Sequence, residues 1–141
     1  MATPQNPGET PIPVYFDCDT GIDDALALAM LLAHPQAYLL GVGTVSGNVD
    51  AAQAATNTLR LLALAGREDI PVAVGEMHPL AGTFPGGATD VHGANGIGDI
   101  ELPDTDMKPA AESAPDMLIR LARAHRGRLH VIAVGPCTNL A

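Results

Sequence analysis

Short apolar runs alternate with stretches of helical periodicity along this chain, and no other feature constrains the fold as much. Each run has the length and composition of a buried strand. The predicted strands lie at 13–16, 38–45, 70–74 and 129–134, and helices are predicted at 23–33, at 49–65 and from Ser113 onward. Strands joined through helices pair in parallel. We therefore predict an α/β fold with an open, largely parallel sheet and flanking helices.

The predicted helices differ in their faces and in how they begin. Ala25–Ala33 is apolar on all sides, which predicts a helix buried all round. Ser46-Gly47-Asn48 has turn chemistry that can cap the helix at 49–65, and N-capping alone is a sufficient reading of Asn48. The helix from Ser113 has Pro115 in its first turn. Its apolar face is expected to hold Met117, Leu118, Leu121 and Ala122.

The segments outside the strands and helices give the domain organisation. Residues 1–11 are polar and predict a flexible N-terminal tail, and residues 12–141 are expected to form one domain. The segment 76–105 is rich in Gly, Pro and Asp, which is typical of a functional or mobile loop. At the end of the chain, Thr138 or Asn139 has the chemistry of a cap for a helix whose body is absent. We therefore expect a truncated chain with one sheet face uncovered.

Charge and hydropathy exclude several kinds of partner. The net charge is −9 with only 7 Lys and Arg residues, so we expect no nucleic-acid binding. The longest apolar stretch is too short to span a bilayer, and we expect no membrane partner. The N-terminus has no basic or apolar signal region, which favours a cytoplasmic protein. The two cysteines do not make a disulfide framework.

Four carboxylates lie within eight residues, at Asp17, Asp19, Asp23 and Asp24. Asp17 and Asp19 follow a predicted strand, and the other two open a helix. If gathered in a low dielectric, these groups repel one another and need positive charge. Oxygen ligands suit a hard divalent cation, Ca²⁺ or Mg²⁺. The alternative is that Asp23 and Asp24 only cap the helix and the others are solvated, but the spacing favours a metal site.

The acidic segment at 17–25, Asp-Cys-Asp-Thr-Gly-Ile-Asp-Asp-Ala, resembles the signature of the inosine-uridine preferring nucleoside hydrolase family. The commonest family form has Pro at the position of Thr20, which is not a ligand. The resemblance continues in order through 44–48, 91–96 and 134–141. It implies a Rossmann-like nucleoside hydrolase fold, of which 12–141 is the N-terminal part of a single domain, since the family is longer than this chain.

The same resemblance implies a set of site residues. Asp19, Asp24 and the backbone carbonyl of Val134 would bind one Ca²⁺, and Asp17 would support them from behind. Substrate contacts are implied for three further residues. Asp23 and Asn48 would hydrogen-bond the ribose hydroxyls, and His92 would lie near the nucleobase. Without the resemblance, His92 reads as a solvated loop histidine.

The implied reaction is hydrolysis of the N-glycosidic bond of a ribonucleoside to ribose and free base. A Ca²⁺-held water would attack the anomeric carbon, with Asp19 as general base. The resemblance also implies a small-molecule nucleoside substrate, a role in purine or pyrimidine salvage, and a homo-oligomer (dimer or tetramer) in the full-length form. The family's last carboxylate ligand and its leaving-group acid belong to its second half, so activity of this chain alone is not implied.

Two other functions stay open. Phe16–Thr20 also resembles the first motif of haloacid-dehalogenase-type phosphatases, with Asp17 as nucleophile, Asp19 as acid/base and Mg²⁺ as metal. That family needs a later lysine, and the only Lys here is Lys108, in a Pro-rich loop. The second alternative is a non-catalytic remnant that binds a metal or a nucleoside.

Overall fold

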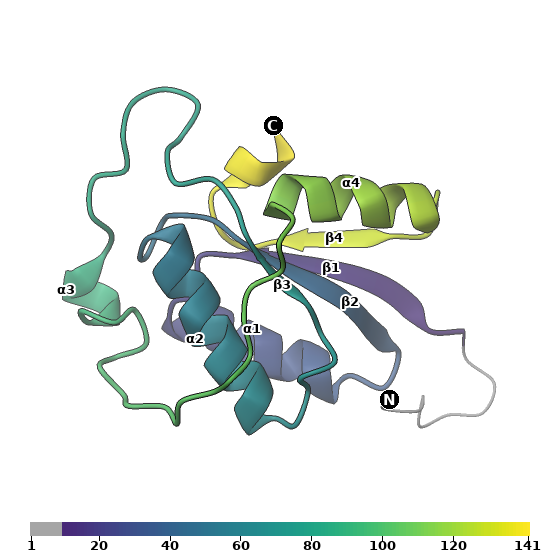
Figure 1. Cartoon of the computed structure of the whole chain (residues 1–141), viewed down its shortest axis with the longest axis horizontal. Helices are drawn as coiled ribbons and strands as arrows, with labels where there is room; N and C mark the ends of the chain where they lie inside the picture. Colours follow the sequence, from purple (N-terminus) through teal and green to yellow (C-terminus); the bar gives the residue numbers. More distant parts are fainter. Residues whose placement is uncertain (1–9) are drawn as a thin grey trace.

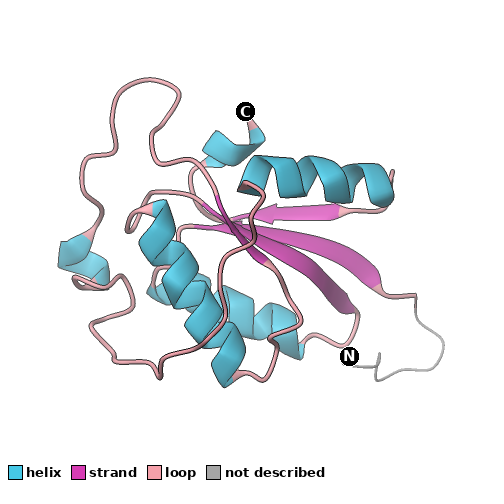
Figure 2. Ribbon diagram, viewed as in Figure 1, coloured by secondary structure: helices cyan, strands magenta, loops and turns pink. Residues whose placement is uncertain are grey.

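A four-stranded parallel sheet forms the centre of the computed structural model, which describes residues 10–141 (Figure 2). Its order is β3-β2-β1-β4, and every neighbouring pair is parallel. The strands are β1 (Ile12–Cys18), β2 (Ala37–Thr44), β3 (Val72–Val74) and β4 (His130–Ala133). The predicted open, parallel α/β sheet is thus confirmed. The tail predicted over 1–11 falls, apart from its last two residues, outside the described residues.

Helices cover both faces of this sheet (Figure 1). On one face lie α1 (Ile22–Ala33) and α2 (Ala51–Leu64), and on the other lies α4 (Ala114–Ala124). The loop after β3 carries the short α3 (Thr89–His92), and a 3-10 turn, η1 (Cys137–Leu140), follows β4. None of the helices in residues 10–141 has the length and apolar character needed to cross a membrane.

Strand β1 divides its side chains between two cores. Val14 and Phe16 pack with α1 and α2, whereas Tyr15 packs with Met117 and Leu121 of α4. This follows from the strand geometry, in which successive side chains point to opposite faces. The central strand is therefore buried on both sides, as parallel sheets require.

Truncating Leu62 is expected to lower the free energy of unfolding by about 2–5 kcal/mol, because Leu62→Ala leaves a cavity under the sheet. Leu62 is fully buried in the larger core. Leu64→Ala is the matched control, since Leu64 lies on the same helix with 65% of its surface exposed. Urea denaturation of both variants tests this. Equal losses would contradict the packing described here.

The sequence predicts that helix α1 is buried on all sides, and this prediction is wrong. Leu28 and Leu31 face the sheet, but Leu26 and Met30 are 70% and 67% exposed. The reason is that α1 lies flat on one face of the sheet, so only one side of the helix meets the core. An apolar run of this length therefore does not separate a one-sided helix from a buried one.

Helix α2 begins two residues later than predicted, and its cap is a different residue. Asp50 is the N-cap, and its side chain accepts a hydrogen bond of 2.7 Å from the Gln53 amide. The capping role expected for Asn48 is therefore wrong. In α4, the Ser113 side chain accepts from Asp116 N, so the predicted start of that helix is confirmed.

The order of the strands creates a topological switch at β1. The chain moves outward from β1 to β2 and β3, and then returns to the opposite side of β1 as β4. Ligands of open α/β sheets bind outside the carboxyl ends of the strands at such a point. The segments that leave β1 and β4 there are 19–21 and 134–136, which include predicted site residues.

Candidate active site

Asp17 lies at the carboxyl end of β1 and is fully buried. Its Oδ2 accepts hydrogen bonds from Asn139 Nδ2 at 3.0 Å and from the Tyr15 hydroxyl at 3.2 Å. Its Oδ1 is buried without a partner in the described structure. Burial raises the pKa of Asp17 to about 6, and the hydrogen bonds from Asn139 and Tyr15 oppose that rise.

Asp19 follows β1 directly and is 6% exposed. Its Oδ2 accepts the backbone N–H of Asn48 at 2.7 Å. Burial raises the pKa of Asp19 to about 6, and the nearby charge of Asp24 adds to the rise. A Cβ placed on Gly47 would lie 2.1 Å from Asp19 Oδ2, so this approach of the two segments needs a glycine.

Asp24 is the third residue of α1 and is buried. Its Oδ2 accepts from the backbone N–H of Gly21 at 2.8 Å and from Asn48 Nδ2 at 3.1 Å. The positive end of the helix dipole favours a carboxylate there. Its Oδ1, like that of Asp17, is buried and has no partner in residues 10–141.

These three buried carboxylates have no basic partner among the described residues. Within residues 10–141, no Lys or Arg forms an ion pair with any of them. Buried carboxylates with free oxygens are costly unless positive charge compensates them, and hard divalent cations prefer such oxygens. In the described part of the chain, no group of three or more acidic, His or Cys side chains is placed to hold a metal ion. A cation at Asp19 and Asp24 would therefore need further ligands.

The backbone after β4 passes next to Asp19. Val134 N–H donates to the Asp17 carbonyl at 2.9 Å, which extends the pairing of β1 with β4. A Cβ on Gly135 would lie 3.0 Å from Asp19 Oδ1. The peptide between Val134 and Gly135 therefore borders the acidic group, where the predicted carbonyl ligand is expected.

Gly21 marks the meeting point of the substrate residues predicted from the sequence. A Cβ there would lie 2.3 Å from Asn48 Nδ2 and 2.8 Å from His92 Nδ1. His92 Nδ1 accepts the backbone N–H of Ile22 at 3.1 Å, which fastens the loop at 76–105 to the start of α1. The Asp23 side chain is 82% exposed, with its Oδ1 4.0 Å from His92 Nδ1.

The structure gathers every site residue predicted from the sequence at one end of the sheet. It also separates the four aspartates into three buried carboxylates and the exposed Asp23. Sequence reasoning missed Tyr15 and Asn139 as partners of Asp17. Tyr15 had a usable signal, because it lies two residues before Asp17 on the same face of a strand. Asn139 had none in the local pattern, since 122 positions separate it from Asp17.

If the carboxylates bind a divalent cation, Gly47→Ala is expected to weaken that binding, with Ca²⁺ as the probe, by at least about tenfold, because the new Cβ displaces the Asp19 carboxylate from its bond with Asn48. Calorimetric titration of the metal-free protein measures this. Gly66→Ala is the control: its positive φ of 65° strains the backbone, but its Cβ meets nothing within 4 Å. Equal Ca²⁺ affinities in the two variants would contradict the role of the Gly47 approach.

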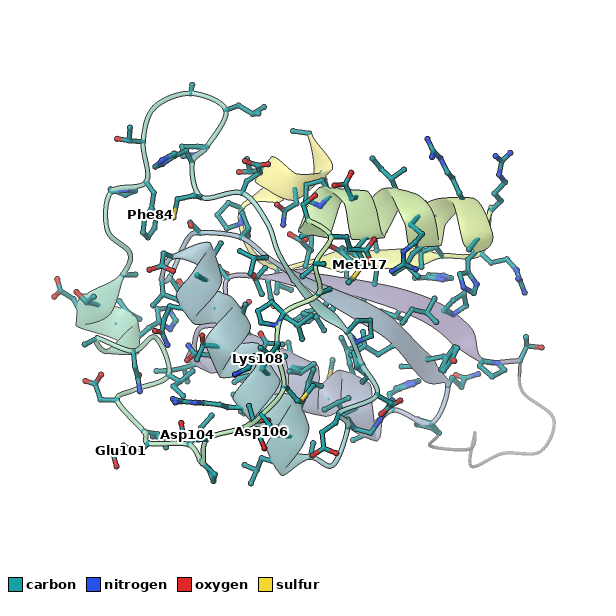
Figure 3. All side chains as sticks on the ribbon, in the orientation of Figure 1. Phe84, Glu101, Asp104, Asp106, Lys108 and Met117 are labelled. Carbon is teal, nitrogen blue, oxygen red and sulfur yellow. The ribbon has the colours of Figure 1, made fainter. Side chains whose placement is uncertain are left out.

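The phosphatase alternative gains no support from the position of the only lysine. Lys108 is exposed and lies in the loop beside Thr56 and Arg60 of α2. Figure 3 shows it with Asp104 and Asp106 along that helix. Asp17 lies instead at the end of β1, enclosed by Tyr15 and Asn139.

Comparison with known proteins finds relatives named as nucleosidases and nucleoside hydrolases. The family model described as inosine-uridine preferring nucleoside hydrolase matches residues 14–141. Uridine nucleosidase 1 of Arabidopsis thaliana is 42% identical over 128 residues, which cover 91% of this chain and 38% of that protein. The pyrimidine-specific ribonucleoside hydrolase RihA of Shewanella oneidensis is 40% identical over 129 residues, which cover 92% of this chain and 40% of that protein.

Solved structures give the same result. A plant nucleoside hydrolase superposes with a TM-score of 0.88 at 41% identity, over 92% of this chain and 41% of that one. The purine-preferring ribonucleoside hydrolase from Gardnerella vaginalis superposes with a TM-score of 0.87 at 34% identity, over 91% of this chain and 42% of that one. The chain thus spans about 40% of the length of the relatives it matches.

Proposed function

The chain belongs to the inosine-uridine preferring nucleoside hydrolase family, and on this premise we propose that it forms the metal-binding part of a hydrolase that cleaves the N-glycosidic bond of ribonucleosides to ribose and free base. The observation that carries the proposal is the group of three buried carboxylates, two of them with partnerless oxygens, at the switch point of the sheet. Residues 12–141 are proposed as the N-terminal part of a single hydrolase domain.

The proposed cation is Ca²⁺, held by Asp19, Asp24 and the backbone carbonyl of Val134. Asp17 would support Asp19 from behind, in line with its burial and its bonds to Tyr15 and Asn139. When bound, such a cation orients a water molecule and eases its deprotonation. The remaining ligands would come from the part of the family's length that this chain does not span.

Asp19 is proposed as the general base. Without a metal, burial raises its pKa to about 6, so it is already deprotonated at neutral pH and can act as a base. The Asn48 N–H bond to its Oδ2 fixes the orientation of the carboxylate. A base that is held in place needs no reorganisation when the proton moves.

Asp23, Asn48 and His92 are proposed to contact the substrate. Asp23 has an exposed carboxylate that can accept a hydrogen bond from a ribose hydroxyl. Asn48 uses its side-chain N–H on Asp24, and the described structure shows no hydrogen bond to its side-chain carbonyl. His92 lies next to Asp23 and Asn48, so the nucleobase would lie toward the loop at 76–105.

The setting of the reaction is part of the proposal. The substrate is a free nucleoside, and no nucleic acid or membrane is expected to take part. The family-length protein is proposed to be a cytoplasmic dimer or tetramer that serves nucleoside salvage. Relatives are named for pyrimidine and for purine nucleosides, so a nucleoside of each class serves as a test substrate.

Ribose release from uridine and inosine tests the proposal, with Ca²⁺ and with a chelator. Because the chain spans about 40% of its relatives, it is assayed alone and in a chimera, where residues 12–141 replace the matching segment of Arabidopsis uridine nucleosidase 1. Calcium-dependent ribose release by the chimera is the expected result. A chimera that folds and binds Ca²⁺ but releases no ribose would contradict it, and phosphate release from a generic phosphomonoester would favour the phosphatase alternative.

A further inference from the structure

Asn139 joins the carboxyl ends of the strands through one side chain. It lies in η1, the yellow turn next to the C-terminus in Figure 1, and is 5% exposed. Its Nδ2 donates to Asp17 Oδ2 and to the carbonyl of Thr44 at the end of β2, both at 3.0 Å. Its Oδ1 accepts from the backbone N–H of Glu76, just beyond β3, at 2.9 Å. One amide thus contacts the segments that end β1, β2 and β3.

The amide of Asn139 has little freedom to turn. Both N–H donors and the carbonyl oxygen are in use, which leaves one acceptor position free. A Cβ on Gly75 would lie 2.2 Å from Asn139 Oδ1, so the backbone presses closely against the amide. A flipped amide would place an N–H against the Glu76 N–H, and a carbonyl oxygen against Asp17 and Thr44, which is unfavourable.

Tyr15 contacts the same carboxylate oxygen. Its hydroxyl lies 3.2 Å from Asp17 Oδ2 and 3.1 Å from the Ala114 carbonyl, and its ring is fully buried. Asn139 Nδ2 donates to Oδ2, and the single hydroxyl proton of Tyr15 is shared between Oδ2 and the Ala114 carbonyl. With no donor on Oδ1 among the described residues, the Asp17 carboxylate has a defined rotation. Oδ1 is then the oxygen left without a hydrogen bond among the described residues.

We infer that Asn139 and Tyr15 are positioning residues: they hold Asp17 by Oδ2 so that its Oδ1 supports cation binding at Asp19 and Asp24. This inference rests on the proposed function and adds two residues to its machinery. Neither residue contacts the substrate or the cation in this scheme. Both act through Asp17, which distinguishes them from residues that only fill the core.

Calcium titration of the full chain by calorimetry tests the inference. Asn139→Ala is expected to weaken Ca²⁺ binding by about 10- to 100-fold, as is typical when a residue that supports a metal ligand is removed. Tyr15→Phe, which keeps the ring and loses only the hydroxyl, is expected to cause a smaller loss and serves if Asn139→Ala does not fold. Leu62→Ala is the control: it lowers stability from a core position without touching the site, and should bind Ca²⁺ as the unsubstituted chain does.

A second measurement needs no metal. In carboxyl ¹³C spectra of the metal-free chain, the Asp17 signal is expected to shift in Asn139→Ala and Tyr15→Phe and to stay in place in Leu62→Ala. An unchanged Asp17 signal would overturn the inference. So would unchanged Ca²⁺ affinity in both site variants while Asp19→Asn loses it, and in that case the proposed function would stand. If the unsubstituted chain binds Ca²⁺ no better than Asp19→Asn, the proposed metal site fails, and the support of cation binding by Asn139 and Tyr15 fails with it.

Discussion

Asp19→Asn is expected to lower ribose release by the chimera about 10³-fold or more, and to abolish tight Ca²⁺ binding. The substitution keeps the size of the side chain but removes an anionic ligand and the proposed base together, and loss of a base alone costs about 10²- to 10⁴-fold. The fold should survive, because Asp19 is a buried carboxyl whose pKa is raised by burial, so a neutral amide is easier to bury. Steady-state ribose assays and calorimetry measure the two losses.

Asp106→Asn is the matched control for this prediction. Asp106 is an exposed aspartate in the loop beside the C-terminal part of α2 (Figure 3), near Arg60 and Leu64. Asp106→Asn changes the net charge by the same amount as Asp19→Asn, but Asp106 lies away from the site. Ribose release and Ca²⁺ binding should match those of the unsubstituted protein. If Asp19→Asn retained calcium-dependent ribose release like this control, the proposed chemistry would be wrong.

The elements of the fold could be predicted because local patterns determine them. The runs that became β1, β2 and β4 are apolar and short, and the run at 70–74 contains β3. The alternation of these strands with helices then predicts a parallel sheet. What local patterns do not contain is which face of an apolar helix meets the sheet, and for that reason the burial of α1 was predicted wrongly.

The candidate site was predictable in part for a different reason. Asp17, Asp19 and Asp24 lie close in sequence, so strand and helix geometry alone brings them together. Asn48, His92 and Val134 came from the family resemblance, and the structure places all three beside the aspartates. A cap was expected at Asn48 because turn chemistry precedes α2, but the bonds of Asn48 with Asp19 and Asp24 hold it away from the helix start.

Asn139 illustrates a contact that cannot be predicted from the local sequence. Its sequence context is that of a helix cap, yet its side chain bonds Asp17, Thr44 and Glu76. The partners belong to segments that meet only when β4 returns beside β1. A contact that depends on the strand order cannot be read from the residues around it, because the order is a property of the whole sheet.

Calcium affinity is expected to fall about 100-fold from pH 7 to pH 5. Ca²⁺ requires deprotonated carboxylates, so binding must displace the protons of any carboxyl that is still protonated. The pKa values of Asp17 and Asp19 are both raised to about 6 by burial. Each group therefore costs about a factor of ten in apparent affinity over that interval. Calorimetry at pH 5, 6, 7 and 8 measures the fall, which should level off above pH 7.

The metal-free chain should show the opposite dependence in its stability. Both carboxyls have a folded pKa of about 6 against an ordinary value of 3.8, so between pH 4 and pH 6 the folded state binds more protons than the unfolded state. Their contribution to the free energy of unfolding is therefore present below about pH 4 and is lost as the pH rises through 6, by roughly 2–3 kcal/mol for each carboxyl. Urea denaturation in chelator should show this decline, Asp17→Asn should reduce it, and saturating Ca²⁺ should reverse it above pH 6. The prediction is contradicted if the stability of the metal-free chain rises from pH 4 to pH 7 and does not respond to Ca²⁺. Burial would then not raise the pKa values of these carboxyls, and they would not bind the cation.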